Sequence, residues 1–108
     1  MYEERRSTQR YAFVATAEVA DSVCVRSANV GDLSIHGCYL AMPEPFSKGA
    51  SVLVKIRTNR EFFQCHATVA HSTHGIGMGL QFHIVSPPFQ IVLQEWLLHT
   101  LQYTETRK

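Results

Sequence analysis

Three arginines lie close together near the start of the chain, at Arg5, Arg6 and Arg10. Arg6 and Arg10 are separated by Ser-Thr-Gln, which places two guanidinium groups four residues apart. A guanidinium group is a planar fork of donors that suits phosphate oxygens and the O6/N7 edge of guanine. The cluster therefore indicates an anion-binding segment, although a solvated basic tail explains it equally well when it is considered alone.

A second polar segment, Asp32-Leu-Ser-Ile-His-Gly37, lies further along the chain. Asp32 and Ser34 are compact hydrogen-bonding residues two positions apart, able to accept from the N1 and N2 donors of a guanine. Gly37 lets the chain turn close by without a side chain in the way. Alone, these residues are also typical of an Asx-type turn between strands, but their presence together with the arginines favours a shared binding site.

Alternating apolar and polar residues predict six short strands, over residues 11–20, 23–30, 38–42, 52–56, 63–69 and 75–82. The alternation slips between Val25 and Ala28, which indicates a bulge or a two-sided environment. The segment that begins at Asp32 is expected to form the turn after the second strand. Ser86 followed by two prolines is typical of a helix start, and apolar residues at steps of three and four predict a helix over 86–103.

These elements predict a mainly all-β fold, a small six-stranded antiparallel β-barrel or a strongly curled sheet, with one C-terminal α-helix that covers apolar side chains at its open mouth. The 108 residues are expected to form a single domain. In it, residues 1–10 form a flexible ligand-binding leader, 11–84 the barrel and 86–103 the helix.

Gly75, Gly77 and Gly79 alternate with large apolar residues in the last predicted strand. This spacing differs from the GxGxxG turn that opens a helix in dinucleotide-binding folds, because a strand continues through it. Three glycines on one face leave exposed backbone that another group can approach closely. Packing within the protein is favoured over ligand contact, with Gly77 and Gly79 as candidates for the floor of a ligand site.

The three cysteines, Cys24, Cys38 and Cys65, are an odd number without CxxC spacing, and each lies in an apolar run. They are expected to be buried, reduced thiols. The one close histidine pair, His71 and His74, falls in a predicted Ser/Thr/Gly-rich turn. Because no second tight pair accompanies it, a structural zinc site is not expected.

Composition argues against several other classes of protein. The formal net charge is only +1, so broad electrostatic attraction to DNA or RNA is not expected. No apolar run approaches the roughly 20 residues that span a bilayer, which predicts a cytoplasmic location without membrane insertion. No spacing suggests a catalytic triad or a pair of catalytic carboxylates, so the chain is not expected to be an enzyme.

Together, the two polar segments resemble the RxxxR and D/N-x-S-x-x-G signature of PilZ domains, bacterial receptors for the second messenger cyclic di-GMP. The resemblance covers nearly the whole chain, because the order of basic leader, strands, acidic segment, GxGxxF-like strand and end helix is similar. It implies a six-stranded barrel with a C-terminal helix and a nucleotide ligand, with no further cofactor. Arg6 and Arg10 match the first motif, and Asp32, Ser34 and Gly37 match the second.

The resemblance also implies a role for each of these residues. Arg6 and Arg10 would contact the phosphates and the guanine Hoogsteen edge, while Asp32 and Ser34 would read the other guanine edge. A carboxylate that accepts from N1–H and N2–H₂ favours guanine over adenine. Gly37 would serve the backbone and not the ligand.

Ligand number and signalling are further expectations from the family. Arg5 occupies the position that influences whether one cyclic di-GMP or an intercalated pair binds, and two molecules per domain are favoured. The leader is expected to become ordered on the ligand and to signal to an unidentified downstream protein that controls processes such as motility or biofilm formation.

Two alternatives remain on the residues alone. A PilZ-like barrel can act as a protein interaction module without binding nucleotide, although intact motifs argue against this here. A barrel that binds single-stranded nucleic acid would need exposed aromatic residues interleaved with basic ones, whereas most aromatics here fall at predicted core positions.

Overall fold

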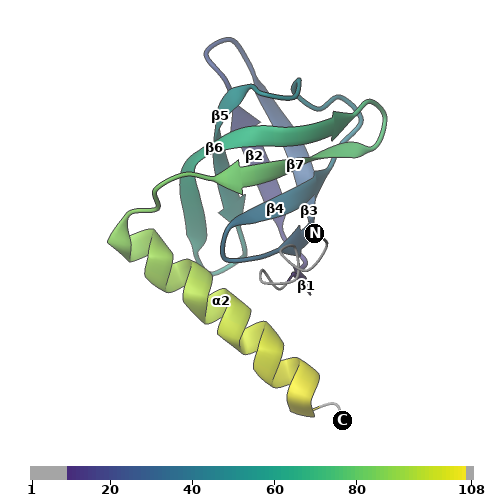
Figure 1. Ribbon diagram of the computed structural model, residues 1–108. Helices are drawn as coiled ribbons and strands as arrows, with labels where there is room; N and C mark the ends of the chain where they lie inside the picture. The colour runs from purple at the N-terminus through teal and green to yellow at the C-terminus, as the bar shows by residue number, and fades with distance from the viewer. Residues whose placement is uncertain (1–9, 107–108) are drawn as a thin grey trace, which may run out of the picture.

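The computed structural model describes residues 10–106, with side chains described as far as residue 100. Seven strands precede a long helix (Figure 1). The strands are β1 Tyr11–Ala12, β2 Thr16–Ala20, β3 Val25–Leu33, β4 Gly37–Ala41, β5 Ser51–Arg57, β6 Phe62–Thr73 and β7 Gly77–Phe82, and the helix is α2 Pro87–Thr106.

All strand pairs are antiparallel, in the order β1-β3-β2-β5-β6-β7-β4. An additional pairing of β3 with β4 joins the sheet to itself. The result is a closed six-stranded barrel, β2 to β7, with β1 as a short extra strand on β3. Closure satisfies the backbone donors and acceptors that an open sheet would leave at its edges, and the predicted fold class is confirmed.

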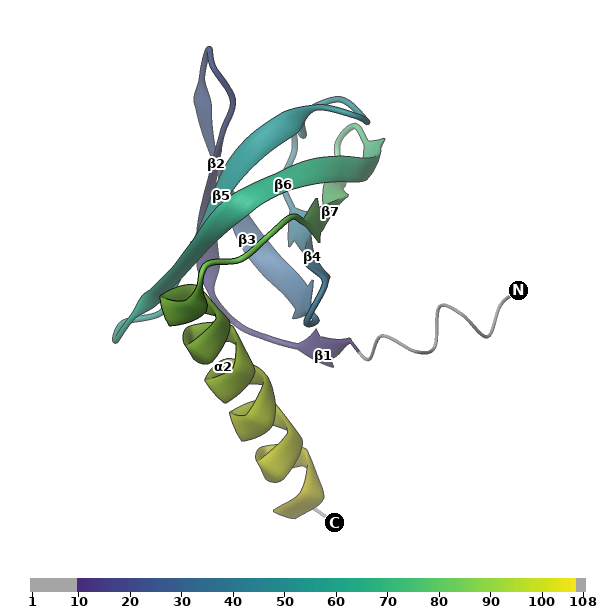
Figure 2. The same cartoon turned by 60° about the vertical axis from the view of Figure 1, so that its left-hand side comes forward.

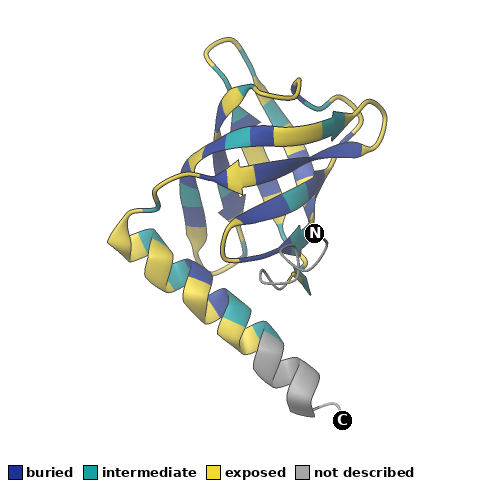
Figure 3. Ribbon diagram, in the orientation of Figure 1, coloured by how far each residue is buried: buried dark blue, intermediate teal, exposed yellow. Residues whose placement is uncertain are grey.

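The barrel interior holds the side chains that alternate inward along each strand, as the dark blue segments show (Figure 3). Its most deeply buried large residues are Val19, Leu33, Leu40, Val54, Ile56, Phe63, Val69 and Met78. Each such side chain contributes about 1.5 to 3 kcal/mol when it is fully withdrawn from water. Cys38 and Cys65 are buried free thiols, as predicted, whereas Cys24 is only partly buried.

Helix α2 covers one mouth of the barrel and then continues beyond it (Figure 2). As far as residue 100, the buried residues of its inner face are Leu93 and Trp96. The Trp96 ring packs against Phe13, with ring centroids 5.0 Å apart, and its indole N–H donates to Glu61 over 3.0 Å. The amphipathic pattern thus predicted the helix correctly, although the helix ends at Thr106 and not at residue 103.

Several predicted strand boundaries were wrong. The first predicted strand is two strands, because the chain leaves the sheet at 13–15, where Phe13 turns toward Trp96. Strand β3 runs through Asp32, which was expected in a turn. Strand β6 runs to Thr73, so His71 lies in a strand and not in the predicted turn, and β7 begins only at Gly77.

Two register shifts reverse the faces of strands β3 and β6. In β3, Val30 pairs with Leu40 and Asp32 with Tyr39, so Gly31 is an extra residue between them. In β6, Val69 pairs with Leu80 and His71 with Gly79, so the extra residue is Ala70. The alternation therefore slips at Gly31. Of the two interpretations of the segment from Val25 to Ala28, a bulge or a two-sided environment, the bulge is wrong, because β3 pairs with β2 there without interruption and Val25 faces outward.

Candidate functional site

The two bulges bring a row of four residues onto the outer face of the barrel. Without the extra residues, Asp32 would share the inward parity of Val30, and His71 that of Val69. With them, the paired positions Asp32, Tyr39, Gly79 and His71 run in register across β3, β4, β7 and β6. Residues in register share a face, so polar side chains from three strands, β3, β4 and β6, meet on one surface with a glycine of β7 between them.

A groove of about 410 Å³ lies on this surface. Its lining residues come from the start of β1, the β3–β4 turn, β6 and β7, and they are Arg10, Ser34, His36, Gly37, Ala70, His71, Gly79, Leu80 and Gln81. Arginine and histidine supply the ionisable groups of this lining, which includes no carboxylate. The groove is therefore suited to an anion, and its apolar and glycine surfaces are suited to a flat ring.

Arg10 and Asp32 are joined at one end of the row. The Arg10 guanidinium donates to the Asp32 carboxylate over 2.5 Å. The local reason is that β1 pairs with the end of β3, with Ala12 opposite Asp32. The arginine just before β1 therefore reaches that carboxylate. The structure thus places the second arginine of the first motif beside the first residue of the second motif, as a single binding site requires.

Ser34 holds the β3–β4 turn together from inside. Its side chain is buried, and its hydroxyl accepts from the backbone N–H groups of His36 and Gly37, over 3.3 and 3.1 Å. The same hydroxyl donates to the Gly37 carbonyl over 3.1 Å. All the partners of this buried hydroxyl lie in the turn, so its observed role is to fix the shape of the turn, and a direct contact between Ser34 and guanine stays a prediction.

Gly37 has no room for a side chain. A Cβ atom at this position would collide with the backbone carbonyl oxygen of Leu80, on the neighbouring strand β7. Because Gly37 pairs with Gln81, the collision lies within the β4–β7 ladder itself. Gly37 therefore lets two backbones approach, in agreement with its predicted role, and does so where the turn meets the groove.

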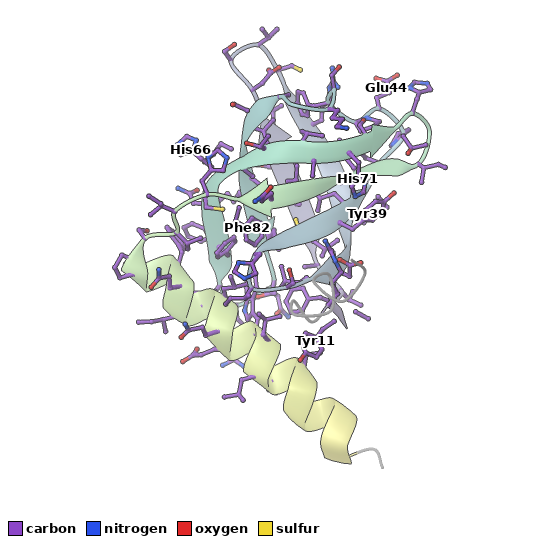
Figure 4. The ribbon with its side chains drawn as sticks, in the orientation of Figure 1. Tyr11, Tyr39, Glu44, His66, His71 and Phe82 are labelled. Atoms are coloured by element: carbon purple, nitrogen blue, oxygen red, sulfur yellow. The ribbon has the colours of Figure 1, made fainter. Side chains whose placement is uncertain are left out.

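The rings of Tyr39 and His71 cover the backbone of strand β7 at its glycines. A Cβ at Gly77 would meet the Tyr39 hydroxyl oxygen at 2.8 Å, and one at Gly79 would meet the His71 imidazole. The two rings lie side by side, with centroids 6.1 Å apart and an interplanar angle of 24° (Figure 4). Packing explains both glycines, yet Gly79 also lines the groove, whereas Gly77 is not among its lining residues.

The predicted site residues are thus only partly together. Arg10, Ser34, Gly37 and Gly79 line the groove, and Asp32 joins it through Arg10. Arg5 and Arg6 lie outside the described residues. Sequence reasoning missed the apolar lining residues Ala70 and Leu80 and three polar ones, His36, His71 and Gln81. His36 sits inside the second motif, which was a usable signal, but the bulge that turns His71 outward has no comparable sequence pattern.

The family assignment follows from comparison with known proteins. A family model of the PilZ domain matches residues 4–99. Because this match covers most of the sequence, the chain belongs to the PilZ domain family. A search of curated proteins finds no significant match.

Solved structures agree on the fold. The PilZ domain of YcgR from Escherichia coli, solved with c-di-GMP, superposes with a TM-score of 0.79 at 13% identity, covering 95% of this chain and 96% of that one. The longer YcgR in complex with c-di-GMP gives 0.78 at 16%, covering 95% and 49%, and the motility inhibitor MotI/DgrA of Bacillus subtilis gives 0.75 at 16%, covering 96% and 53%. This chain spans about half the length of those last two proteins.

Proposed function

We propose that this chain is a receptor for cyclic di-GMP that binds the nucleotide in the groove beside Arg10 and Asp32. The supporting observation is the juxtaposition of these two side chains at the rim of a carboxylate-free groove. Two structural neighbours, the YcgR domain and the longer YcgR, were solved with c-di-GMP. Arg10 would hold a phosphate or the guanine Hoogsteen edge, and Asp32 the guanine N1–H and N2–H₂ donors.

Binding would exchange one ion pair for two ligand contacts. In the free groove, Arg10 and Asp32 form an ion pair with each other, and both side chains are partly exposed. A phosphate oxygen would replace the carboxylate as the acceptor for Arg10, which frees Asp32 to accept from guanine. Because an exposed ion pair contributes only about 0 to 1 kcal/mol, the exchange costs the receptor little.

The remaining predicted ligand contacts come from Arg5 and Arg6, which lie outside the described residues. Arg6 would supply a second guanidinium to the phosphates, and Arg5 would neutralise a second, intercalated ligand, giving two molecules per domain. The leader would become ordered when it closes on the anion, and a downstream protein would recognise the ordered leader or the surface that it covers. A cytoplasmic location would fit this role; no helix among residues 10–106 is long and apolar enough to cross a membrane.

Calorimetric titration tests the proposal directly. Cyclic di-GMP is titrated into the parent protein, Arg10→Ala and Asp32→Ala, with Arg57→Ala as the matched control, because Arg57 is an exposed arginine outside the groove. Removing a charged hydrogen-bond partner is expected to weaken binding by about 1.5 to 3 kcal/mol, roughly ten- to a hundredfold, for the first two variants only.

Each outcome has a distinct meaning. No heat with the parent protein rejects the nucleotide and favours a PilZ-like interaction module. Equal binding by all four proteins places the site elsewhere. A fitted stoichiometry of one ligand per chain contradicts the role proposed for Arg5.

A further inference from the structure

Two histidines of the groove have no role in the proposed contacts. His36 lies in the β3–β4 turn and His71 on β6, and both are exposed side chains that line the groove together with Arg10. Histidine is the side chain that ordinarily changes charge between about pH 5 and pH 8. A groove suited to an anion therefore contains two side chains that carry a positive charge when they are protonated.

The position of His71 is set by three neighbouring residues. The extra residue Ala70 in β6 turns His71 to the outer face, where it pairs with Gly79 of β7. The absence of a side chain at Gly79 lets the imidazole lie directly over the backbone, and the Tyr39 ring of β4 stacks beside it. The ring is thus held at the groove wall by packing, before any ligand is present.

The charges around these histidines favour an anion as their partner. The groups of the groove and its rim that carry or can gain charge are Arg10, His36, His71, the rim carboxylate of Asp32 and, stacked on His71, the phenol of Tyr39. Strand β7 contributes glycine, leucine and the uncharged Gln81 to the lining. The carboxylate at the rim, Asp32, is already paired with Arg10. No carboxylate of the lining competes with a bound phosphate for a protonated imidazole.

We propose that His36 and His71 are ligand-binding residues whose protonation strengthens the hold of the groove on phosphodiester groups, so that ligand affinity rises as pH falls. This inference rests on the proposed function, and it adds a proton-linked regulation to the same site. The phosphodiesters of a cyclic dinucleotide stay charged across the neutral range, so the change in charge comes from the protein.

The sign and size follow from elementary linkage. A group that binds its proton more tightly in the complex adds affinity at low pH, and that gain is lost as the pH rises through its titration. A partly exposed charge pair is worth up to about fivefold in affinity. Two such pairs therefore predict an increase of up to about twenty-five-fold between about pH 8 and about pH 6.

The experiment is a titration of cyclic di-GMP at these two pH values and constant ionic strength. Four variants are compared with the parent: His71→Gln, His36→Gln, the double variant, and His66→Gln as the matched control. His66 is an exposed histidine of the same strand β6 that lies outside the groove. Thermal unfolding of each protein at both pH values verifies that the fold is intact, so the readout is the ratio of two dissociation constants within one protein.

The expected result is a reduced ratio for each groove variant, a ratio near one for the double variant, and the parent ratio for His66→Gln. A double variant that keeps the parent ratio overturns the inference, as does a parent protein that binds equally well at both pH values. Absence of binding by the parent at either pH overturns the proposed function itself, which keeps the two failures distinguishable.

Discussion

The guanidinium of Arg10 donates to the carboxylate of Asp32 across 2.5 Å, and the two residues come from the two separate polar segments of the sequence. Their side chains are 48% and 35% exposed, so the pair contributes about 0 to 1 kcal/mol to stability. A contact of this strength positions two groups without locking them. A substitution in this pair can therefore change ligand binding while it leaves the stability of the domain almost unchanged.

Replacing Asp32 by Leu should weaken guanine selectivity while leaving the fold intact. The leucine keeps the approximate size of the side chain but presents no acceptor, so binding of cyclic di-GMP loses about 1 to 3 kcal/mol. Calorimetry with cyclic di-GMP and cyclic di-AMP should show the preference falling by about five- to a hundredfold. Thermal unfolding should move by less than about 1 kcal/mol. Unchanged selectivity would remove Asp32 from the site.

Ser34→Ala should act mainly through stability. The buried hydroxyl accepts from two backbone N–H groups and donates to one carbonyl, and all three groups lose a partner. We expect the free energy of unfolding to fall by about 1 to 3 kcal/mol, measured by denaturant titration. Ser27→Ala, on the exposed face of β3, is the control and should change it by less than about 0.5 kcal/mol. Equal effects would contradict the turn's dependence on Ser34.

Gly37→Ala should be more damaging than Gly31→Ala, although both glycines flank the same turn. At Gly37 the new methyl group meets the backbone carbonyl of Leu80, which cannot move without disturbing β7. At Gly31 it meets the ring of Tyr39 at 3.3 Å, and a side chain can shift. Chemical denaturation should show a loss of about 1 to 3 kcal/mol or more for Gly37→Ala and a smaller loss for Gly31→Ala. The reverse order would refute this account.

The cysteines should differ sharply in reactivity. Burial raises the pKa of Cys65 to about 12, and burial also raises the pKa of Cys38 well above its ordinary value. Because the thiolate is the reactive form, neither should be alkylated in the folded protein at neutral pH. Cys24 is partly exposed and should react. Mass spectrometry after brief iodoacetamide treatment should find the label on Cys24 alone, and on all three cysteines after denaturation.

Asp21 predicts a specific change of stability in acid. Backbone N–H groups of Cys24 and Val23 donate to its carboxylate and lower its pKa below the ordinary value of 3.8. A lowered pKa stabilises the fold above the unfolded value, and that contribution is lost as the pH falls through the folded value. Asp21→Ala should therefore be less stable than the parent at about pH 5, with the difference shrinking towards about pH 2.

The control for this measurement is Glu18→Ala. Glu18 is an exposed carboxylate on the neighbouring strand β2. Its removal should leave the acid dependence of the unfolding free energy close to that of the parent. A constant difference in the free energy of unfolding between Asp21→Ala and the parent across the pH range would show that the turn between β2 and β3 does not depend on the charge of Asp21.

Local patterns in the chain were sufficient for the fold class. Successive side chains of a strand point to opposite faces of the sheet, so alternating apolar residues indicate which face is inward. The structure buries all four members of one such run, Phe63, Cys65, Ala67 and Val69. The helix followed in the same way from its spacing of three and four. The motif residues Asp32, Ser34 and Gly37 were likewise visible as a compact polar segment, because they lie close together in sequence and the turn that Ser34 and Gly37 build is local.

Tertiary structure alone decided which side chains face the groove. The extra residues Gly31 and Ala70 reverse the parity of their strands, and their positions follow from how β3 fits β4 and how β6 fits β7. Such a fit depends on partners far away in sequence, so no local pattern reports it. The same bulges that bring Asp32 and His71 onto one surface are therefore the features that the amino-acid sequence, taken strand by strand, leaves undetermined.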